Sequence, residues 1–367
     1  MKKILVALGT RPEAIKLAPL ILALKRERAF SVLLCHSGQH DTLSDEVLRL
    51  FEIEEDVNLR ICDVGSDISA LSSAALLGYG GVICENSPDC VIVHGDTLTA
   101  FFASLAAFYF KIPIFHVEAG LRSHDIYSPF PEEWNRVAID VLATLCFAPT
   151  EEARENLIAL RGNDKGIFVV GNTVTDALAY TVDKDYKSPL IDKDKRLIIF
   201  TSHRRENIGE PLRNICLAVK RIAEEFSDVE ILCPMHPNPL VRDIIIPLLS
   251  ENKNIVLAEP MSVYDFHNML SRAYLVLSDS GGIQEEASTL GIPMLICRDK
   301  TERNEGCKSG IIKLTGVHSE EIYANMKSLL TSREEYERMK SNAFSYGDGK
   351  VSERITEIIK KYFSSPI

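Results

Sequence analysis

The sequence lacks any strong bias of composition. Of its 367 residues, 46% are hydrophobic and 25% are charged, which is close to the average for globular proteins. It therefore does not match disordered chains, collagen or coiled coils. Its 41 Lys and Arg against 52 Asp and Glu give a net charge of −11. A surface this acidic repels nucleic acid and anionic membranes, so we expect neither as a partner.

The cysteines and the N-terminal run exclude further classes. The nine cysteines are widely spread, without a C-x-x-C pair or a metal-ligand spacing beside His. We therefore expect free thiols in a reducing cytoplasm, and no metal site. The first apolar run ends at Gly9-Thr10-Arg11, too early for a signal peptide or a membrane span. We interpret this run as a first β-strand.

Short apolar runs alternate with longer amphipathic segments along nearly the whole chain. This alternation predicts the α/β class, with two Rossmann-like domains that each contain a doubly wound parallel sheet. The predicted strands are 4–9, 30–36, 90–95, 112–120, 146–150 and 167–172, then 197–202, 229–234, 254–260, 274–280 and 292–297. Helices are expected at 12–27, 43–52, 97–110 and 132–144.

The polar stretch 180–196 is the best candidate for a linker. We therefore predict an N-terminal domain over 1–180 and a C-terminal domain over 181–351. The amphipathic tail 352–367 is expected to form a helix that packs back on the first domain. Ligands of open α/β sheets bind beyond the carboxyl ends of the strands. Because polar loops follow the strands of both domains, we expect one ligand in a cleft.

Three motifs that follow strands offer groups for an anion. GTRPEAIK (9–16) places Arg11 and Lys16 at a helix start, SHRREN (202–207) places two arginines at a strand end, and SDSGG (278–282) opens a helix with two glycines. Cations, or amide groups at a helix N-terminus, suit a diphosphate. An ordinary strand-to-helix turn would explain GTRPE or SDSGG alone. The chain has neither G-x-x-x-x-G-K-[ST] nor G-x-G-x-x-G, which argues against a P-loop and against NAD.

Carboxylates at strand ends and helix starts form a second group of candidates. Asp96 lies in HGDT, Glu118 in HVEAGLR and Glu132 in SPFPEEWNR. Each of Asp96 and Glu132 alone could be a helix cap. Glu118 follows an apolar strand, so we expect it to be partly buried and suited to acid–base chemistry. We interpret His94 and His116 as packing or orienting residues.

Taken together, these motifs resemble the non-hydrolysing UDP-N-acetylglucosamine 2-epimerases. The resemblance runs from about residue 2 to 360 and rests on the order and spacing of GTRPEAIKLAP, HGDT, FHVEAGLRS, YSPFPEE-x-NR, GNTV-x-DAL, HRREN, DSGGIQEEA, RD-x-TER and YGDG. It implies a fold like the B-type glycosyltransferases and a homodimer. It also implies reversible conversion of UDP-GlcNAc to UDP-ManNAc without a cofactor, through elimination of UDP to 2-acetamidoglucal and its re-addition, for surface polysaccharide synthesis.

The resemblance also assigns roles to residues of this sequence. The implied catalytic residues are Asp96, Glu118, Glu132 and His203. The implied substrate-binding residues are Arg11, Lys16, Arg136, Arg205, His236, Ser280, Gly281, Gly282, Glu286 and Arg303. Gln39 and His40 match a segment that binds a second, activating UDP-GlcNAc, although the residues that follow, Asp41 and Thr42, depart from the family pattern.

Other functions stay open at this stage. The pocket that reads C4 and C6 of the sugar is not visible in the sequence, so a related UDP-2-acetamido sugar is an alternative substrate. A hydrolysing epimerase would release free ManNAc instead. A non-catalytic UDP-sugar sensor would not need the acid–base residues, and glycosyl transfer is compatible with the fold alone.

Overall fold

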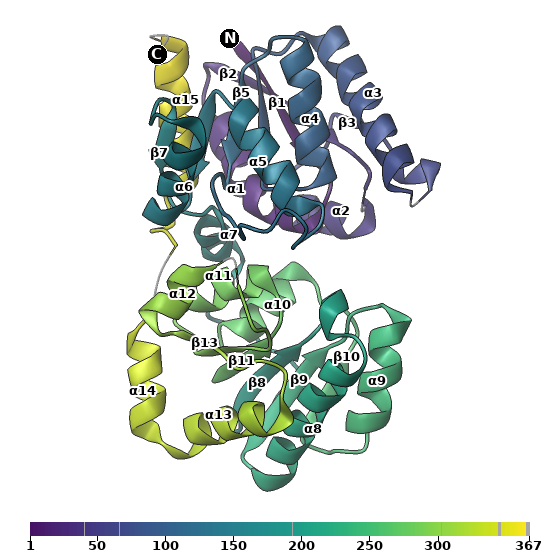
Figure 1. Ribbon diagram of the computed structural model, residues 1–367, viewed down its shortest axis with the longest axis vertical. Coiled ribbons are helices and arrows are strands. Elements are labelled where there is room, and N and C mark those ends of the chain that lie inside the picture. The colour runs from purple at the N-terminus through teal and green to yellow at the C-terminus, as the bar shows by residue number, and fades with distance from the viewer. Residues whose placement is uncertain (40, 66, 193, 302, 344–345, 365–367) are drawn as a thin grey trace. The chain divides into compact units, whose positions relative to one another are not determined.

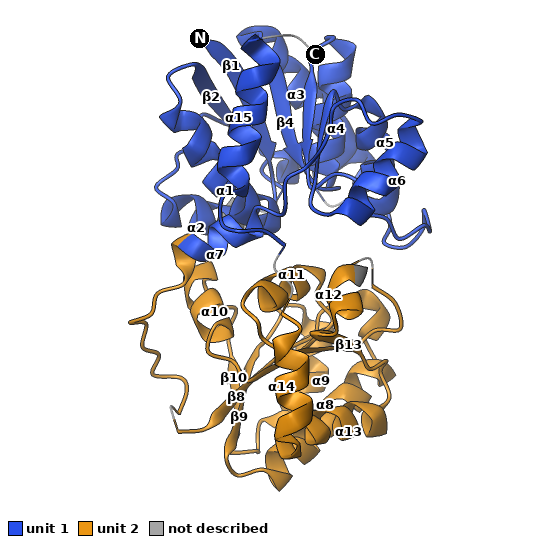
Figure 2. Ribbon diagram, turned by 90° about the vertical axis from the view of Figure 1, so that its left-hand side faces the viewer, with its two compact units in different colours: residues 1–179, 346–367 blue, residues 180–345 orange. Residues whose placement is uncertain are grey.

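The computed structural model describes residues 1–39, 41–65, 67–192, 194–301, 303–343 and 346–364 (Figure 1). The chain divides into two compact units, residues 1–179 with 346–367 and residues 180–345 (Figure 2). Each unit is built on one parallel sheet with helices between its strands. The predicted α/β class with two doubly wound parallel sheets is confirmed.

Unit 1 contains a seven-stranded sheet in the order β3-β2-β1-β4-β5-β6-β7. Its strands are β1 (Lys2–Leu8), β2 (Phe30–His36), β3 (Val57–Asn58), β4 (Cys90–His94), β5 (Ile114–Val117), β6 (Leu145–Ala148) and β7 (Ile167–Val169). Its helices are α1 (Arg11–Arg26), α2 (Asp41–Leu50), η1 (Ile61–Val64), α3 (Ile68–Asn86), α4 (Leu98–Tyr109), α5 (Glu132–Leu142), α6 (Glu151–Arg161), α7 (Val174–Thr181) and α15 (Val351–Ser364). The end of α7, from Tyr180, belongs to unit 2.

Unit 2 contains a six-stranded sheet in the order β10-β9-β8-β11-β12-β13. Its strands are β8 (Arg196–Thr201), β9 (Val229–Pro234), β10 (Ile255–Ala258), β11 (Leu275–Ser278), β12 (Met294–Ile296) and β13 (Ile312–Leu314). Its helices are η2 (Arg205–Asn207), α8 (Glu210–Glu225), α9 (Pro239–Leu249), α10 (Val263–Leu270), α11 (Gly281–Thr289), α12 (Asn304–Ser309), α13 (Ser319–Thr331) and α14 (Arg333–Ser341).

Both sheets are covered by helices on their two faces, which explains why their strands are apolar throughout. In unit 1, α3, α4, α5 and α6 pack side by side, and α1 packs with α2 and α15. In unit 2, α8, α9, α13 and α14 contribute to one apolar core, and α10 and α11 contribute to another. A strand buried on both faces needs no alternation of polar and apolar residues. The strand order reverses direction beside β1 and beside β8, where such sheets bind ligands.

The C-terminal helix α15 belongs to unit 1 and lies against α1. Lys360 pairs with Glu27 at 3.2 Å, and Tyr362 packs edge-on against Phe115 of β5. The stretch between α7 and β8 belongs instead to unit 2, where Arg272 donates hydrogen bonds to the carbonyls of Asp183, Lys184 and Tyr186. In the sequence, the boundary between the two units falls at residue 180, where the predicted linker begins.

Helix α3 is the most apolar long helix among the described residues, and by length and composition it could cross a membrane. It packs along α4, with Tyr79, Val82 and Ile83 in the core of unit 1. These contacts identify α3 as a helix of the folded unit. Its outer side exposes two large apolar side chains, Ile68 and Leu77.

Candidate active site

The strand that carries Glu118 ends earlier than predicted. β5 stops at Val117, and Glu118 adopts the left-handed conformation, with φ of 63°. Gly120 follows at φ 87°, where a Cβ atom would lie 2.2 Å from the carbonyl oxygen of Ala153. A non-glycine residue in this conformation is uncommon and is found preferentially at functional sites. The turn directs a carboxylate back to the carboxyl edge of the sheet.

Glu118 lies in a buried cluster of cationic and amide groups. Lys16 of α1 forms a hydrogen-bonded ion pair with its Oε2, and Asn172 Nδ2 donates to the same oxygen at 3.1 Å. Arg136 of α5 lies 3.7 Å from Oε1 and donates to the backbone oxygen of Glu118 at 2.6 Å. These cations and hydrogen-bond donors offset part of the cost of burying the carboxyl group.

Arg136 also joins Glu118 to Asp96. Its guanidinium forms an ion pair with Asp96 Oδ2, and Asn135 donates to the backbone oxygen of Asp96 at 2.9 Å. Asp96 does not cap a helix, because the N-cap of α4 is Thr97. Asp96 and Glu118, which lie apart in the sequence, thus contact the same arginine.

His94, at the end of β4, adds a buried neutral imidazole to this cluster. Its Nε2 lies 3.7 Å from Glu118 Oε2 and has no hydrogen-bond partner among the described residues. Burial, with the nearby charges of Lys16 and Arg136, lowers the pKa of His94 to about 3, although the charge of Glu118 opposes this. His94 is therefore neutral at physiological pH.

The buried His94 predicts a stability change at acidic pH. Because its pKa is about 3 in the folded state and about 6.5 in an unfolded chain, only the unfolded state gains this proton as pH falls below about 6.5. The resulting loss is at most about 1.4 kcal/mol per pH unit. We expect His94→Gln to reduce the difference between unfolding free energies measured in urea at pH 7.5 and at pH 6.0. The exposed His318→Gln should leave that difference unchanged, and an equal effect of both substitutions would contradict this prediction.

Other predicted residues of unit 1 occupy different positions. Glu132 begins α5, and its neighbour Glu133 is buried and accepts hydrogen bonds from the backbone of Ser123 and His124. Arg11 begins α1. Gln39 accepts a hydrogen bond from Thr99 Oγ1 at 3.2 Å. His40, the other predicted activator contact, lies outside the described residues.

In unit 2, Asp279 organises the loop that carries His203. This fully buried carboxylate accepts hydrogen bonds from Ser202 Oγ at 2.6 Å, from the backbone N–H groups of His203 and Arg204 at 3.1 Å, and from Asn207 Nδ2 at 2.9 Å. The loop after β8 is thereby fixed to the end of β11, its neighbour in the sheet. The sequence analysis did not single out Asp279.

The His203 ring is exposed and stacks on His236. The ring centroids lie 5.6 Å apart with an interplanar angle of 16°, and His203 Nδ1 lies 3.5 Å from Asp279 Oδ1. Burial and the charge of His203 lower the pKa of His236. The short distance between the two rings thus disfavours protonation of His236.

The glycine motif of unit 2 opens a helix, as the sequence predicts. Ser280 is the N-cap of α11, Gly281 is its first residue, and a Cβ atom on Gly282 would meet no atom within 4 Å. Glu286 lies with its Oε1 3.5 Å from His267 Nε2. Arg303 is paired with buried Glu285 at 2.6 Å, and Arg205 is exposed in η2.

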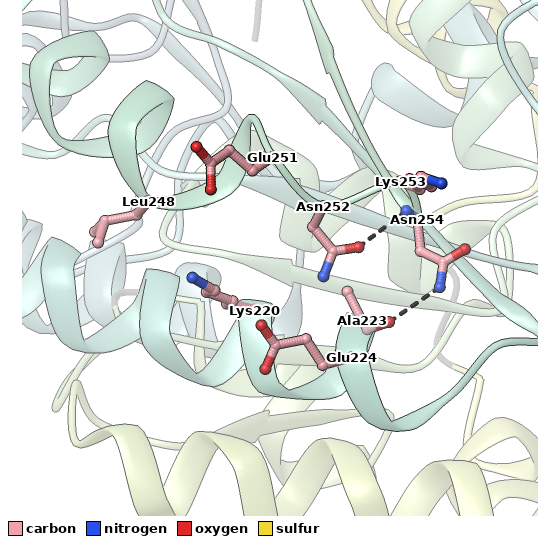
Figure 3. A pocket seen from close by; sticks show the side chains of 8 residues that line it. All are labelled: Lys220, Ala223, Glu224, Leu248, Glu251, Asn252, Lys253 and Asn254. Carbon is pink, nitrogen blue, oxygen red and sulfur yellow. Dashed lines mark hydrogen bonds between the residues drawn. The ribbon is translucent and has the colours of Figure 1, made fainter.

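Two further features of the described residues do not join these clusters. His36, Asp45 and Glu55 have possible metal ligands within 4.8 Å of one another, but His36 Nδ1 accepts from Gly38 N at 2.9 Å and its Nε2 contacts Ser44 Oγ at 2.7 Å. A hollow in unit 2 is lined by Lys220, Ala223, Glu224, Leu248, Glu251, Asn252, Lys253 and Asn254 (Figure 3). These residues lie at the ends of α8 and α9 and before β10, at the sheet edge opposite the motifs.

The sequence analysis passed over three residues that organise these clusters. Asn172 binds Glu118, Asp279 holds the His203 loop, and Glu13 binds the turn after β1. Asp279 and Glu13 each lie one or two residues from a predicted site residue. Their position inside the motifs was the only sequence signal for these two residues. The sequence does not show whether such a carboxylate is buried and accepts hydrogen bonds from backbone N–H groups or is exposed to solvent.

The two parallel-sheet units, with polar loops at the carboxyl edges, define a two-domain α/β protein of GT-B-like architecture. Solved structures with this fold include S. aureus MnaA with UDP, with a TM-score of 0.94 and 45% identity over 99% of this chain and 97% of that one. They also include UDP-GlcNAc 2-epimerase from Neisseria meningitidis bound to UDP-GlcNAc, with a TM-score of 0.92 and 40% identity over 98% of this chain and 100% of that one.

Sequence comparisons identify the family. The family described as UDP-N-acetylglucosamine 2-epimerase matches residues 22–360. The UDP-N-acetylglucosamine 2-epimerase of Bacillus subtilis is 44% identical over 97% of this chain and 94% of its own length. The chain belongs to the UDP-N-acetylglucosamine 2-epimerase family, and the resemblance inferred from its motifs is confirmed.

Proposed function

We propose that this chain converts UDP-N-acetylglucosamine and UDP-N-acetylmannosamine into each other by inverting C2 of the sugar. The observation that carries the proposal is the pair of carboxylates, Asp96 and Glu118, that Arg136 holds together beside Lys16. A protein that only bound a nucleotide sugar would have no use for two carboxylates held in this way. Family membership supports the same reaction.

The proposed chemistry follows from the acidity of C2–H. This hydrogen is not next to a carbonyl group, because C1 is bound to the diphosphate. We propose that a carboxylate takes the C2 proton and that the electrons of the C2–H bond form a C1=C2 double bond. The C1–O bond breaks at the same time, and the electron pair of that bond leaves with UDP. The product is 2-acetamidoglucal. Re-addition of UDP to C1 with a proton delivered to the opposite face of C2 completes the inversion.

We propose roles for the predicted residues in this scheme. Asp96, Glu118 and Glu132 serve proton transfer and the positive charge that develops near C1, and His203 assists the departing diphosphate. Lys16, which forms an ion pair with Glu118, and Arg136, which forms one with Asp96, also bind the substrate. The remaining predicted binding residues contact UDP or the sugar: Arg11, Arg205, His236, Ser280, Gly281, Gly282, Glu286 and Arg303. The open space over Gly282 favours an approaching phosphate.

Turnover in D₂O tests the proposed reaction. We expect UDP-ManNAc formed from UDP-GlcNAc to carry deuterium at C2, because the proton that returns exchanges with solvent. NMR of the purified product measures this. UDP-ManNAc that keeps its original hydrogen at C2 would exclude the elimination route.

The same assay separates the alternative functions. Free ManNAc as the main product would identify a hydrolysing epimerase, and UDP binding without any sugar product would identify a sensor. Turnover of another UDP-2-acetamido sugar in preference to UDP-GlcNAc would reassign the substrate. Each of these results would contradict the proposal.

We further propose a cytoplasmic homodimer that supplies ManNAc units for surface polysaccharide synthesis. The exposed apolar side chains of α3 and α4, among them Leu77, Phe108 and Tyr109, offer a surface for a second copy. The nine cysteines are free thiols, which suits a reducing compartment. We also propose that Gln39 and His40 bind an activating nucleotide sugar.

A further inference from the structure

Two of the motif loops leave neighbouring strands and meet at the carboxyl edge of the unit 1 sheet. β1 and β4 pair in parallel. The turn after β1 contains Gly9 and Thr10, and the loop after β4 contains Gly95, Asp96 and Thr97. The two loops approach closely, because a Cβ atom on Gly9 would lie 2.4 Å from Thr99 Oγ1 in the first turn of α4.

Glu13 connects these two loops through its two carboxylate oxygens. It is only 1% exposed. Its Oε2 accepts hydrogen bonds from the backbone N–H groups of Gly9 at 3.1 Å and Thr10 at 2.8 Å. Its Oε1 accepts from the hydroxyl of Thr97 at 2.6 Å. One buried side chain therefore binds both the turn between β1 and α1 and the loop that contains Asp96.

The Thr97 hydroxyl is fixed from both sides. Its oxygen accepts from the backbone N–H of Ala100 at 3.0 Å, as the N-cap of α4. Its hydrogen is therefore left for Glu13. Asp96, the preceding residue, is held on its other side by Asn135 and Arg136 of α5. The position of Asp96 thus depends on α5 from one side and on α1, through Thr97, from the other.

Helix capping alone does not account for Glu13. A capping-box glutamate uses one oxygen for the N-cap N–H and can stay exposed to water. Here burial raises the pKa of the Glu13 carboxyl to about 7, although hydrogen bonds from Thr97, Thr10 and Gly9 oppose this rise. Burying this carboxylate is costly, and its second oxygen is directed at a loop from a distant part of the sequence.

We propose that Glu13 is a positioning residue for the epimerisation, because its carboxylate holds the Asp96 loop against α1 through the hydroxyl of Thr97. The inference rests on the proposed function, since Asp96 matters only if it takes part in the reaction. Glu13 does not touch the substrate in this role. It sets where the Asp96 carboxylate lies, and small displacements of such a group lower the rate strongly.

Thr97→Val tests the proposal by removing only the hydroxyl. We expect kcat to fall at least about tenfold and KM to change less than about threefold, because the reaction step is affected more than binding. Thr97→Ser keeps the hydroxyl and should retain at least half of kcat. The matched control is Thr150→Val, which removes the N-cap hydroxyl of α6 in the same unit and should leave kcat within about twofold, although it costs a similar helix cap.

Glu13→Gln supplies the second arm of a double-mutant cycle. Its amide cannot accept hydrogen bonds at both ends, so one of the two loops is released. If Glu13 acts through Thr97, the double variant should be no slower than the slower single variant. Multiplicative losses in the double variant, or a kcat of Thr97→Val within about twofold of the parent, would overturn the proposal.

Failure of the proposed function has a different signature. In that case the parent chain itself would not epimerise UDP-GlcNAc. Amide hydrogen exchange then tests the positioning role without turnover: residues 95–98 should exchange faster in Thr97→Val and Glu13→Gln than in Thr150→Val. Equal exchange in all three variants would overturn it.

Discussion

Replacing Glu118 by Gln is expected to lower turnover of UDP-GlcNAc at least about tenfold. The amide keeps the shape of the side chain but can neither take a proton nor stabilise positive charge near C1. Steady-state kinetics on the purified variant measure the loss. Glu230→Gln is a matched control, because Glu230 is also a buried carboxylate. It lies near the start of β9, away from the motifs, and accepts a hydrogen bond from the backbone N–H of Asp192. It should keep turnover within about twofold.

A double variant separates the chemical role of Glu118 from its structural one. Glu118→Gln removes the carboxylate that pairs with buried Lys16, which should cost about 3 kcal/mol of unfolding free energy. Adding Lys16→Met removes the buried cation as well, so stability measured in urea should return toward that of the parent while turnover stays low. Recovery of turnover in the double variant would show that Glu118 only neutralises Lys16.

The fold could be predicted from the sequence because strands buried on both faces are apolar throughout. That signal identified most of both sheets, including β1 and β8, but it could not define where strands end. The predicted strand 112–120 ends at Val117, because Glu118 takes a left-handed conformation that composition does not reveal. Helix α3 escaped prediction for a related reason: its apolar residues are not confined to the buried side, since Ile68 and Leu77 are exposed, so it lacks a clear amphipathic pattern.

The residue types of the candidate site could be predicted from the sequence. Which side chains contact one another could be predicted less well. Strand-end motifs pointed to Asp96 and Glu118 in unit 1 and to His203 in unit 2, because polar residues after buried strands meet at the carboxyl edge of their own sheet. Lys16 and Arg136 were predicted to bind the substrate, and the sequence did not indicate that both also contact carboxylates of the protein itself. Which cation meets which anion depends on side-chain directions across different elements. No spacing along the chain encodes those directions.

Replacing His203 by Ala is expected to lower turnover at least about tenfold while UDP affinity, measured by calorimetry, changes less than about threefold. The imidazole would assist the diphosphate as it leaves C1, so its loss affects the reaction step more than binding. The loop should keep its conformation in this variant. Asp279 accepts a hydrogen bond from the backbone N–H of residue 203, and this bond does not require the imidazole ring.

Free imidazole provides a sharper test of the same role. The His203 side chain is 40% exposed, so a small imidazole can reach the space that the ring leaves in His203→Ala. Addition of imidazole should restore part of the lost turnover, and the restored turnover should vary with pH as the added imidazole titrates. His318→Ala, at another exposed histidine of unit 2, should show neither the loss nor the response. A His203→Ala variant with turnover close to that of the parent would remove His203 from the reaction, since a group that assists bond cleavage cannot be deleted without a kinetic effect.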